Sequence, residues 1–357
     1  MNSLSDALIL DILVYFEGDP RVLAQIGGVS RRFYRLSRDR ALWRRVNFGG
    51  ASQRFNLQKL RQFLRAPVAR HLESLKLEGY LRGACHFSHT KNSFSDKFFE
   101  HLGQCCPTLR ELHVVYAACQ KFSLEKAPKS IEFLSFARSV VDYKLLVKLN
   151  NSDVLPKLKG LDLSYCHGLS SLSGSVKAIL GRKDLRALSL RHCFKVSKED
   201  LCEIPYSLPR LTKLDLSDCH SVDDDVLFHL SQASQTSGIC RLKDLNVSRN
   251  AAVSDAGVAH LGSSQSLVET LEKVGLAETG VSDAALTILA RFSNLKFVSV
   301  AQTSCSSEAV RRLKGGFAHS CRVQFDPTLA CDEGQPEGGW FLPQFDDEQC
   351  VEVMDTD

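Results

Sequence analysis

The chain has 357 residues, 44% of them hydrophobic and 24% charged, a balance typical of a protein that folds around a core, so wholesale disorder is excluded. Its net charge of +4 is unevenly distributed: ten of the 41 acids and none of the 45 basic residues follow residue 325, so the body carries +14 and the last segment −10. The basic residues of the body are scattered rather than clustered, so we expect no nucleic-acid partner.

The number and spacing of the cysteines and the length of the apolar runs indicate the cellular compartment. The chain has 13 cysteines, an odd number, and no Cys-x-x-Cys pair, which favours reduced thiols. No apolar run approaches the roughly 18 residues that span a membrane, and no basic leader precedes the first apolar stretch. We therefore expect a protein of the cytoplasm, the nucleus or both, with no membrane partner.

The first 45 residues predict three short helices. The Gly-Asp-Pro sequence at residues 18–20 ends the first helix, and Gly27-Gly28 ends the second. The apolar positions of this segment are, in chain order, Leu8, Ile9, Ile12, Leu13, Phe16, Leu23, Ile26, Val29, Phe33, Leu36, Leu42 and Trp43. Helices this short bury too little apolar surface to be stable alone, so we expect the segment to need a partner.

These residues resemble an F-box, whose usual form has a Leu-Pro pair, a helix with Ile and Leu positions, a Val-Ser-Arg-x-(Trp/Phe) motif and a final Leu-Trp pair. The matching residues are Leu4, Ile12, Leu13, Phe16, Val29, Ser30, Arg31, Phe33, Leu42 and Trp43. Ser5 stands where the family usually has Pro, and we expect this departure to weaken docking somewhat. The alternative is a three-helix bundle that packs only its own core and has no adaptor function.

Residues 46–70 predict a linker helix. The sequence LQKLRQFL places Leu57, Leu60 and either Phe63 or Leu64 on one helix face, and Pro67 follows its end. We expect this helix to pack the first segment rigidly onto the part of the chain that follows.

Residues 71–325 contain an internal repeat. The segments that begin at Leu158, Leu185 and Leu211 all fit the pattern L-x-x-L-x-L-x-x-C-x-x-(L/V). Looser copies occur on both sides, and from Ile131 onward the copies begin at spacings of 27, 27, 26, 31, 29 and 24 residues. The pattern resembles that of leucine-rich repeats, close to their cysteine-containing subclass.

The physical basis of the repeat predicts its fold. Leu161 and Leu163 alternate with Asp162, as in a short strand with one apolar face. The stretch at residues 282–292 has apolar residues at helical spacing, with Ser282 or Asp283 as its N-cap. Stacked strand–helix units share a core that one unit cannot bury alone. We therefore expect an α/β solenoid with a concave parallel sheet and outer helices.

The repeated cysteines allow two interpretations. Cys166, Cys193 and Cys219 each neighbour a histidine (His167, His192 and His220), as in a ladder of metal ligands. The repeat itself prescribes Cys or Asn at this position, however, where a polar atom can satisfy the turn backbone, and we favour this second reading. Likewise, we interpret the acids at residues 223–225 as a helix start rather than a calcium loop. We expect no metal and no cofactor.

An F-box followed by leucine-rich repeats resembles one family of proteins, the substrate receptors of SCF-type cullin–RING ubiquitin ligases. The resemblance implies that the F-box binds a Skp-type adaptor, that the adaptor connects to a cullin scaffold and a RING subunit, and that the repeats bind an unknown protein substrate. No catalytic residue is implied, and the chain has no serine-hydrolase, phosphate-loop or zinc-protease motif. The alternative is a non-catalytic repeat scaffold or inhibitor.

Two sets of contact residues are expected. The adaptor-binding set is Leu4, Leu8, Ile9, Ile12, Leu13, Phe16, Leu23, Val29 and Trp43. The substrate-binding set comprises the outward-facing strand residues and the position after them, namely Lys76, Glu78, His113, Asp162, Tyr165, Arg191, His192, Lys213, Asp215, Asp218, Asn246 and Arg249. Residues 326–357 form an acidic segment that we expect to be extended or disordered.

Overall fold

The structure is a computed structural model, and it describes residues 4–16, 19–48, 57–79, 94–119, 122–166, 176–237, 241–316 and 321–325. Its α-helices are α1 (Asp6–Val14), α2 (Pro20–Gly27), α3 (Arg31–Leu36), α4 (Leu57–Leu64), α5 (Asp96–Cys105), α6 (Tyr143–Asn150), α7 (Lys198–Ser207), α8 (Asp224–Ser237), α9 (Asp255–Ser263), α10 (Gln265–Thr270), α11 (Asp283–Leu289) and α12 (Ser307–Gly316). Three 3-10 helices are η1 (Arg40–Trp43), η2 (Pro67–His71) and η4 (Lys177–Ile179). Among the helices in these ranges, none combines the length and the apolar character that crossing a membrane requires.

The strands are β1 (Arg45–Asn47), β2 (Ser74–Glu78), β3 (Glu111–Val115), β4 (Ala118–Cys119), β5 (Phe133–Ser135), β6 (Val140–Val141), β7 (Gly160–Asp162), β8 (Ala187–Ser189), β9 (Lys213–Asp215), β10 (Asp244–Asn246), β11 (Lys273–Gly275), β12 (Phe297–Ser299) and β13 (Arg322–Gln324). Within the described residues, eleven of them form one sheet in the order β1-β2-β3-β5-β7-β8-β9-β10-β11-β12-β13, and every neighbouring pair is parallel. Strands β4 and β6 pair separately.

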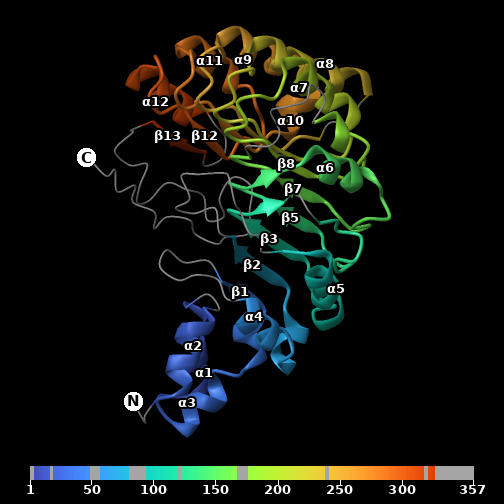
Figure 1. The fold of residues 1–357 in the computed structure, drawn as a ribbon. Coiled ribbons are helices and arrows are strands. Elements are labelled where there is room, and N and C mark those ends of the chain that lie inside the picture. Colours follow the sequence, from blue (N-terminus) through green and yellow to red (C-terminus); the bar gives the residue numbers. More distant parts are fainter. Residues whose placement is uncertain are drawn as a thin grey trace, which may run out of the picture.

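The chain forms the leucine-rich-repeat solenoid that its sequence predicts. Figure 1 shows the sheet on the inner side of an arch, the helices α5 to α12 on its outer side, and α1 to α3 at one end. Leu161 and Leu163 are buried on one side of β7, while Leu286 and Leu289 of α11 pack into the same core from outside. This continuous core runs through all the repeats, because each unit completes the apolar surface of its neighbour.

Serine and aspartate residues hold the starts of successive outer helices together. Ser282 caps α11, as predicted, because its hydroxyl accepts the N–H of Ala284. Asp255 of the preceding helix accepts both the N–H and the hydroxyl of Ser282, at 2.8 and 2.6 Å. Asp283 binds Ser306 in the same way one repeat later, at 2.6 and 2.7 Å. Each capping serine is therefore fixed by the acid of the repeat before it.

The join between the first helices and the repeats is made by a strand and by aromatic rings. Strand β1 pairs with β2, so the sheet begins inside the segment predicted as a linker. Helix α4 covers the residues predicted for it, and the ring of its Phe63 lies 5.4 Å from that of Trp43 and 5.3 Å from that of Phe48. The indole N–H of Trp43 also donates to the carbonyl of Ser37, at 2.7 Å. Trp43 thus connects the helical segment to the repeats.

Candidate functional site

The N-terminal helical segment, α1 to η1, has a small core of its own. Five apolar side chains pack together in it, each at most 5% exposed: Ile9, Leu13, Leu23, Leu36 and Leu42. The expectation that Ile9, Leu13 and Leu23 contact an adaptor is therefore corrected, because these side chains face each other. Trp43 is half-buried at the join with α4, and its contact with an adaptor stays a prediction.

A second set of apolar side chains on α1 faces outward. Leu8 is 52% exposed, Ile12 49% and Tyr15 84%. Their spacing places them on one side of the helix, roughly 100° around the axis from Ile9 and Leu13. We call Leu8, Ile12 and Tyr15 the exposed apolar stripe. An apolar stripe that the chain itself leaves exposed is typical of a surface that another protein covers.

Three other predicted adaptor contacts are also exposed. They are Leu4, Phe16 and Val29, at 38%, 42% and 72%. Tyr15 and Tyr34, the latter 49% exposed, belong to the same segment but were not predicted, because they lie outside the F-box pattern. Apolar side chains at the surface therefore occur on α1, before α1 and around α3.

Ion pairs orient α1 against α3. The Asp6 carboxylate contacts Arg32 at 2.7 Å and Arg35 at 2.5 Å. The hydrogen bond from Arg32 is the main reason that the pKa of Asp6 lies below its ordinary value. Ser5, which stands where the F-box pattern usually has Pro, caps α1, because its hydroxyl accepts the N–H of Leu8 at 3.3 Å. The departure from the family pattern thus has a structural role at the start of the helix.

In the repeats, the sheet register places one residue of each strand in a single row, as the repeat frame predicts. This row, which we call the concave row, includes Lys76, His113, Ser135, Asp162, Ser189, Asp215, Asn246, Gly275 and Ser299. Many of its side chains are nevertheless buried: His113 is 2% exposed, Asp162 3%, Asp215 4% and Asn246 6%. Glu78, at the end of β2, is 9% exposed. These five residues were expected to contact substrate directly, and burial corrects that expectation.

Hydrogen bonds within the turns explain why these polar side chains are buried. Asp162 accepts the N–H of Ser164 at 2.9 Å and the hydroxyl of Ser135 at 2.7 Å. Asp215 accepts the N–H and the hydroxyl of Ser217, at 3.0 and 2.6 Å. Such side-chain bonds to the backbone two residues later end the strand and shape the turn. The buried acids of the concave row therefore stabilise the repeat.

The two lysines predicted on this face are half-buried. Lys213 lies 3.4 Å from the carboxylate of Asp244 in the next repeat, so Asp244 partly neutralises its positive charge within the sheet. Burial raises the pKa of the neighbouring Asp215 carboxyl, while the bonds from Ser217 act in the opposite direction.

The residue directly before the repeated turn position, which is occupied by Ala, Ser, Cys, Asn or Thr, has a left-handed backbone. These residues, which we call the rim row, are Tyr116, Arg138, Tyr165, His192, Asp218, Arg249, Glu278 and Gln302, with φ between 51° and 63°. Left-handed backbone is unusual for residues other than glycine. From Tyr116 to Glu278, the N–H of each residue donates to a carbonyl of the next repeat, for example Tyr165 to Arg191 at 2.8 Å and His192 to Ser217 at 2.9 Å.

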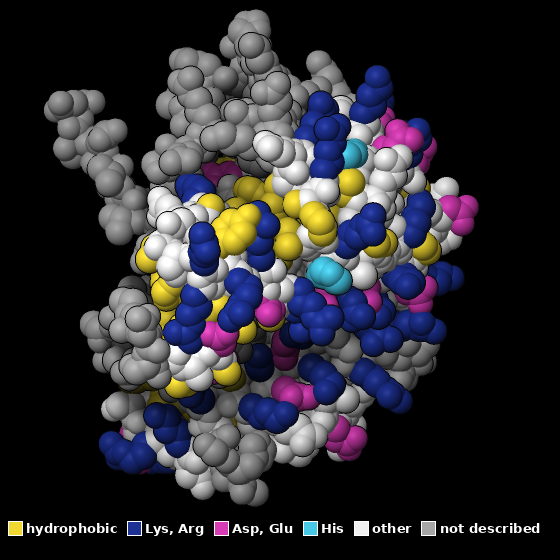
Figure 2. Space-filling model, turned by 90° about the horizontal axis from the view of Figure 1, so that it is seen from below, with side chains coloured by type: hydrophobic (Ala, Val, Ile, Leu, Met, Phe, Trp, Pro, Cys, Tyr) yellow, Lys and Arg dark blue, Asp and Glu magenta, His cyan; other side chains and the backbone are white. Residues whose placement is uncertain are grey.

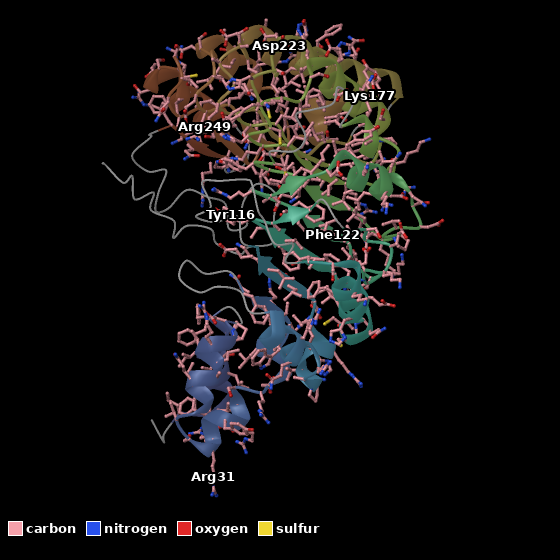
Figure 3. All side chains as sticks on the ribbon, in the orientation of Figure 1. Arg31, Tyr116, Phe122, Lys177, Asp223 and Arg249 are labelled. Carbon is pink, nitrogen blue, oxygen red and sulfur yellow. The ribbon has the colours of Figure 1, made fainter. Side chains whose placement is uncertain are left out.

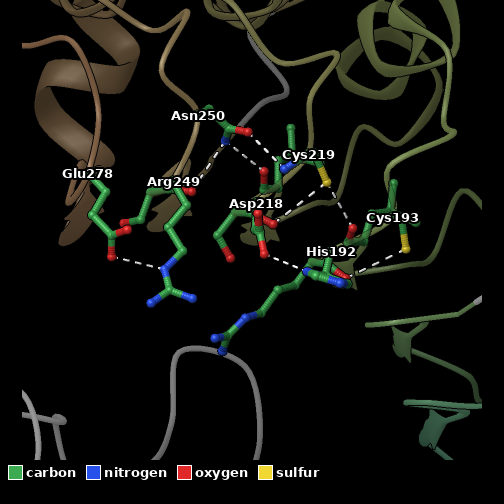
Figure 4. A network of polar contacts seen from close by, with 12 residues as sticks. His192, Cys193, Asp218, Cys219, Arg249, Asn250 and Glu278 are labelled. Carbon is green, nitrogen blue, oxygen red and sulfur yellow. Dashed lines mark hydrogen bonds and ion pairs between the residues drawn. The ribbon is translucent and has the colours of Figure 1, made fainter.

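The side chains of the rim row contact one another along the arch. The Arg138 guanidinium lies 4.6 Å from the centre of the Tyr165 ring, which stacks on His192 at 4.4 Å. His192 Nδ1 lies 2.5 Å from an Asp218 carboxylate oxygen, and Arg249 binds Glu278 at 3.0 Å (Figure 4). In Figure 3, two labelled members of the row, Tyr116 and Arg249, lie on the inner side of the arch, away from Lys177 and Asp223 among the outer helices.

Further side chains widen this surface at its centre. Arg191 lies over the Tyr165 ring at 5.5 Å. Phe194 is 40% exposed, and its ring lies 3.9 Å from that of His192 and 4.6 Å from that of His220. Aromatic side chains and arginine are the residues that most often dominate protein–protein interfaces. The rim row is thus the best candidate for a protein-binding surface among the described repeats.

The sequence pointed to half of the rim row. Tyr165, His192, Asp218 and Arg249 were predicted as surface residues. Tyr116, Arg138, Glu278 and the adjacent Phe194 were not. The signal that identifies the row is its position directly before the repeated turn residue, which also applies to the looser copies of the repeat.

The repeated cysteines bind backbone rather than each other. The Cys166, Cys193 and Cys219 thiols donate to carbonyls of the preceding repeat, at 3.1, 3.2 and 3.0 Å. Burial raises the pKa of the Cys219 thiol to about 12. The interpretation of these cysteines as turn residues is confirmed. His167 lies outside the described residues, and the residues that are described contain no group of three or more metal-type ligands.

Basic residues spread over the face that Figure 2 shows, and many of them pair with acids. Where the strands begin, Lys159 contacts Glu132 at 2.6 Å. Glu272 lies between Lys243 and Lys296, at 2.6 and 2.5 Å. Their hydrogen bonds, Lys243 first, lower the pKa of Glu272. The positive charge at this edge is therefore partly neutralised, which does not favour a continuous track for nucleic acid.

Residues 6–49 match the family model described as F-box-like, and none of the curated proteins matches the chain. Among solved structures, internalin C2 of Listeria monocytogenes is 18% identical, with a TM-score of 0.39, over 66% of this chain and 77% of its own. The mouse RP105/MD-1 complex is also 18% identical, with a TM-score of 0.40, over 67% of this chain and 39% of its own. Functional inference therefore depends on the surfaces of this chain.

Proposed function

We propose that this protein is the substrate-recognition subunit of an SCF-type cullin–RING ubiquitin ligase. In this role the F-box-like segment binds a Skp-type adaptor, which connects it to the cullin scaffold and the RING subunit, and the repeats bind a protein substrate. The expected location is the cytoplasm or the nucleus, and the modified substrate is directed to proteasomal degradation.

The observation that carries the proposal is the exposed apolar stripe on the F-box-like segment. Leu8 and Ile12 leave about half of their surface uncovered although the segment has only five buried apolar side chains of its own. Covering two such side chains contributes roughly 2–4 kcal/mol to association. A repeat scaffold or inhibitor without an adaptor has no use for such a stripe, which is why we favour the receptor.

The receptor contributes no catalytic group of its own. Ubiquitin transfer to a substrate lysine is accelerated because the complex holds the two reactants together, and this raises their effective concentration. The rim row supports the second half of the proposal, since its mixture of Tyr, Arg, His and acids is typical of protein-binding surfaces.

A closer resemblance belongs to the same proposal. The sequences LWRRV, HLESLKLEGYL and HLGQCCPTLREL are similar to the twelfth numbered member of the family of F-box and leucine-rich-repeat proteins. We propose a related role for this chain.

The test is binding of purified adaptor to the full chain. The double substitution Leu8→Ala plus Ile12→Ala should weaken adaptor binding at least tenfold and leave the urea midpoint nearly unchanged, because both side chains are exposed. Leu13→Ala should instead lower the free energy of unfolding by about 2–5 kcal/mol, because it opens a cavity in the small core.

Val147→Ala on α6 is the matched control. Val147 is 46% exposed, like Ile12, but lies among the repeats, so its replacement should not change adaptor affinity. Wild-type affinity in the double variant, or an equal loss in the Val147 variant, contradicts the proposed adaptor surface.

A further inference from the structure

The rim row together with Arg191, Phe194 and His220 forms a surface that we call the rim surface. Two of its arginines converge on one tyrosine ring. Arg138 lies 4.6 Å from the centre of the Tyr165 ring, and Arg191 lies 5.5 Å from the same centre. They come from the turns after β5 and β8, on either side of the turn that carries Tyr165. Backbone bonds fix this arrangement, because Arg138 donates to Ser164 and Tyr165 donates to Arg191, both at 2.8 Å.

These two arginines differ from the neighbouring basic residues in their ion pairing. In the rim row, His192 is paired with Asp218 and Arg249 with Glu278. Within the part of the chain that the structure describes, neither Arg138 nor Arg191 has an ion-pair partner within 4 Å.

The nearest acids on the sheet are already occupied. The Asp215 carboxylate feels the charge of Arg191 but accepts two bonds from Ser217. The Asp162 carboxylate accepts bonds from Ser135 and Ser164. Both acids are buried, so neither reaches outward to neutralise the guanidinium groups at the surface. The arginines therefore place two positive charges around the Tyr165 ring at the rim.

From this arrangement we propose that the rim surface binds a segment of the substrate that carries glutamate or aspartate next to a bulky apolar side chain. A carboxylate between Arg138 and Arg191 continues the alternation of positive and negative groups that the rest of the row displays. Guanidinium–carboxylate pairs are planar and can be bidentate, which gives geometric selectivity. This inference rests on the proposed function for the role of the bound segment.

The neighbouring aromatic surface provides the second half of the recognition. His192, Phe194 and His220 form a consecutive stack, and Phe194 is exposed. An apolar side chain of the segment that packs on Phe194 is removed from water while its acidic neighbour reaches the arginines. The surface thus selects for an acidic residue and an apolar residue in close sequence, rather than for charge alone.

The experiment measures fluorescence anisotropy of two labelled peptides with the full chain, both alone and with its adaptor. One peptide alternates glutamate and phenylalanine, and the other replaces each glutamate by glutamine. We expect the glutamate peptide to bind at least tenfold more tightly, and Arg138→Ala and Arg191→Ala each to reduce its affinity about fivefold or more. Arg138→Lys, which keeps the charge but not the planar group, should restore part of the loss.

Arg210→Ala is the matched control. Arg210 is exposed, like Arg138, but it lies outside the rim row and its charge is paired with Asp184, so its replacement should change peptide affinity less than twofold. Each measurement is repeated in a full chain whose ten acids after residue 325 are replaced by their amides, so that the chain's own carboxylates do not compete.

Equal affinity for the two peptides in both backgrounds overturns the inference, as does an equal effect of Arg210→Ala and Arg138→Ala. The inference is also overturned if the chain prefers a phosphoserine peptide to the glutamate peptide. It is overturned as well if Arg138 is needed to bind an oligothymidylate but the glutamate peptide does not bind. Adaptor binding is measured in parallel for every variant. If the wild-type chain does not bind the adaptor, this result counts against the proposed function alone. The peptide results test only the rim surface.

Discussion

The side-chain amide of Asn250 accepts a hydrogen bond from the backbone N–H of Cys219, its counterpart in the preceding repeat, at 2.8 Å (Figure 4). The same amide donates to the carbonyls of Leu216 and Val247, at 2.9 and 2.8 Å. Cys219 serves only the Leu190 carbonyl of the repeat before it, at 3.0 Å, and its own turn at a longer distance. Asn250 therefore satisfies more buried backbone groups than the cysteines at the equivalent positions.

Replacing Asn250 should be more costly than replacing a repeated cysteine. Asn250→Ala leaves a buried N–H and two buried carbonyls without these partners, and we expect a loss of about 2–4 kcal/mol in the free energy of unfolding. Cys193→Ala removes one weak thiol donor and a small apolar volume, so its cost should be about 1 kcal/mol. Urea denaturation of both variants measures the difference. Equal losses would show that the amide contributes no more than the thiol.

Much of this architecture could be predicted from the sequence, because the repeat fixes periodic features. The strand at Leu161 and Leu163 and the cap at Ser282 follow from alternation and from capping chemistry, and both are present. The interpretation of Cys166 as a turn residue also follows, because an isolated thiol in a repeat has backbone groups to satisfy.

Other features could not be predicted because two arrangements fit the same pattern. Leu8 and Ile12 have the same spacing as Ile9 and Leu13, so periodicity does not tell which pair of α1 is buried. The alternation in β7 places Asp162 on the concave face but does not reveal that the turn buries it. The left-handed backbone at Arg138 does not follow from its residue type either, since arginine rarely adopts it.

The buried acid Asp215 should make stability depend on pH. Burial raises the pKa of its carboxyl, the bonds from Ser217 oppose the rise, and the net shift is upward. A carboxyl whose pKa is higher in the folded protein binds its proton more tightly there. Its contribution to stability is therefore greatest below the unfolded pKa and declines as the pH rises through the folded pKa. At pH 7 the ionised form is a net cost.

Asp215→Asn should therefore be at least as stable as the wild type at pH 7, and its advantage should shrink as the pH falls toward 4. Asn246 indicates that an amide suits this position, because it accepts the N–H of Ser248 at 3.1 Å in the next repeat. Asn246→Asp is the reverse control, and it should be less stable than the wild type at pH 7. Urea midpoints between pH 4 and pH 8 test both variants. An Asp215→Asn variant that is clearly less stable at pH 7 would mean that the charge is favourable.

Relative to alanine, glycine should stabilise the protein at a left-handed position of the rim row and destabilise it at a helical position. Gln302 has φ 55°, where a Cβ atom costs about 1–2 kcal/mol and glycine costs less. Because glycine also loses more conformational entropy on folding, the net gain is smaller. We expect the free energy of unfolding of the Gln302→Gly variant to be about 0.5–1 kcal/mol higher than that of the Gln302→Ala variant.

Ala290 provides the matched control for this prediction. It is exposed, like Gln302, but ends α11 with φ −59°. There glycine relieves no strain, so Ala290→Gly should lower the free energy of unfolding by about 0.5–1 kcal/mol. Chemical denaturation of the three variants gives the sign in each case. If glycine destabilises both positions equally, the left-handed backbone at Gln302 stores no strain.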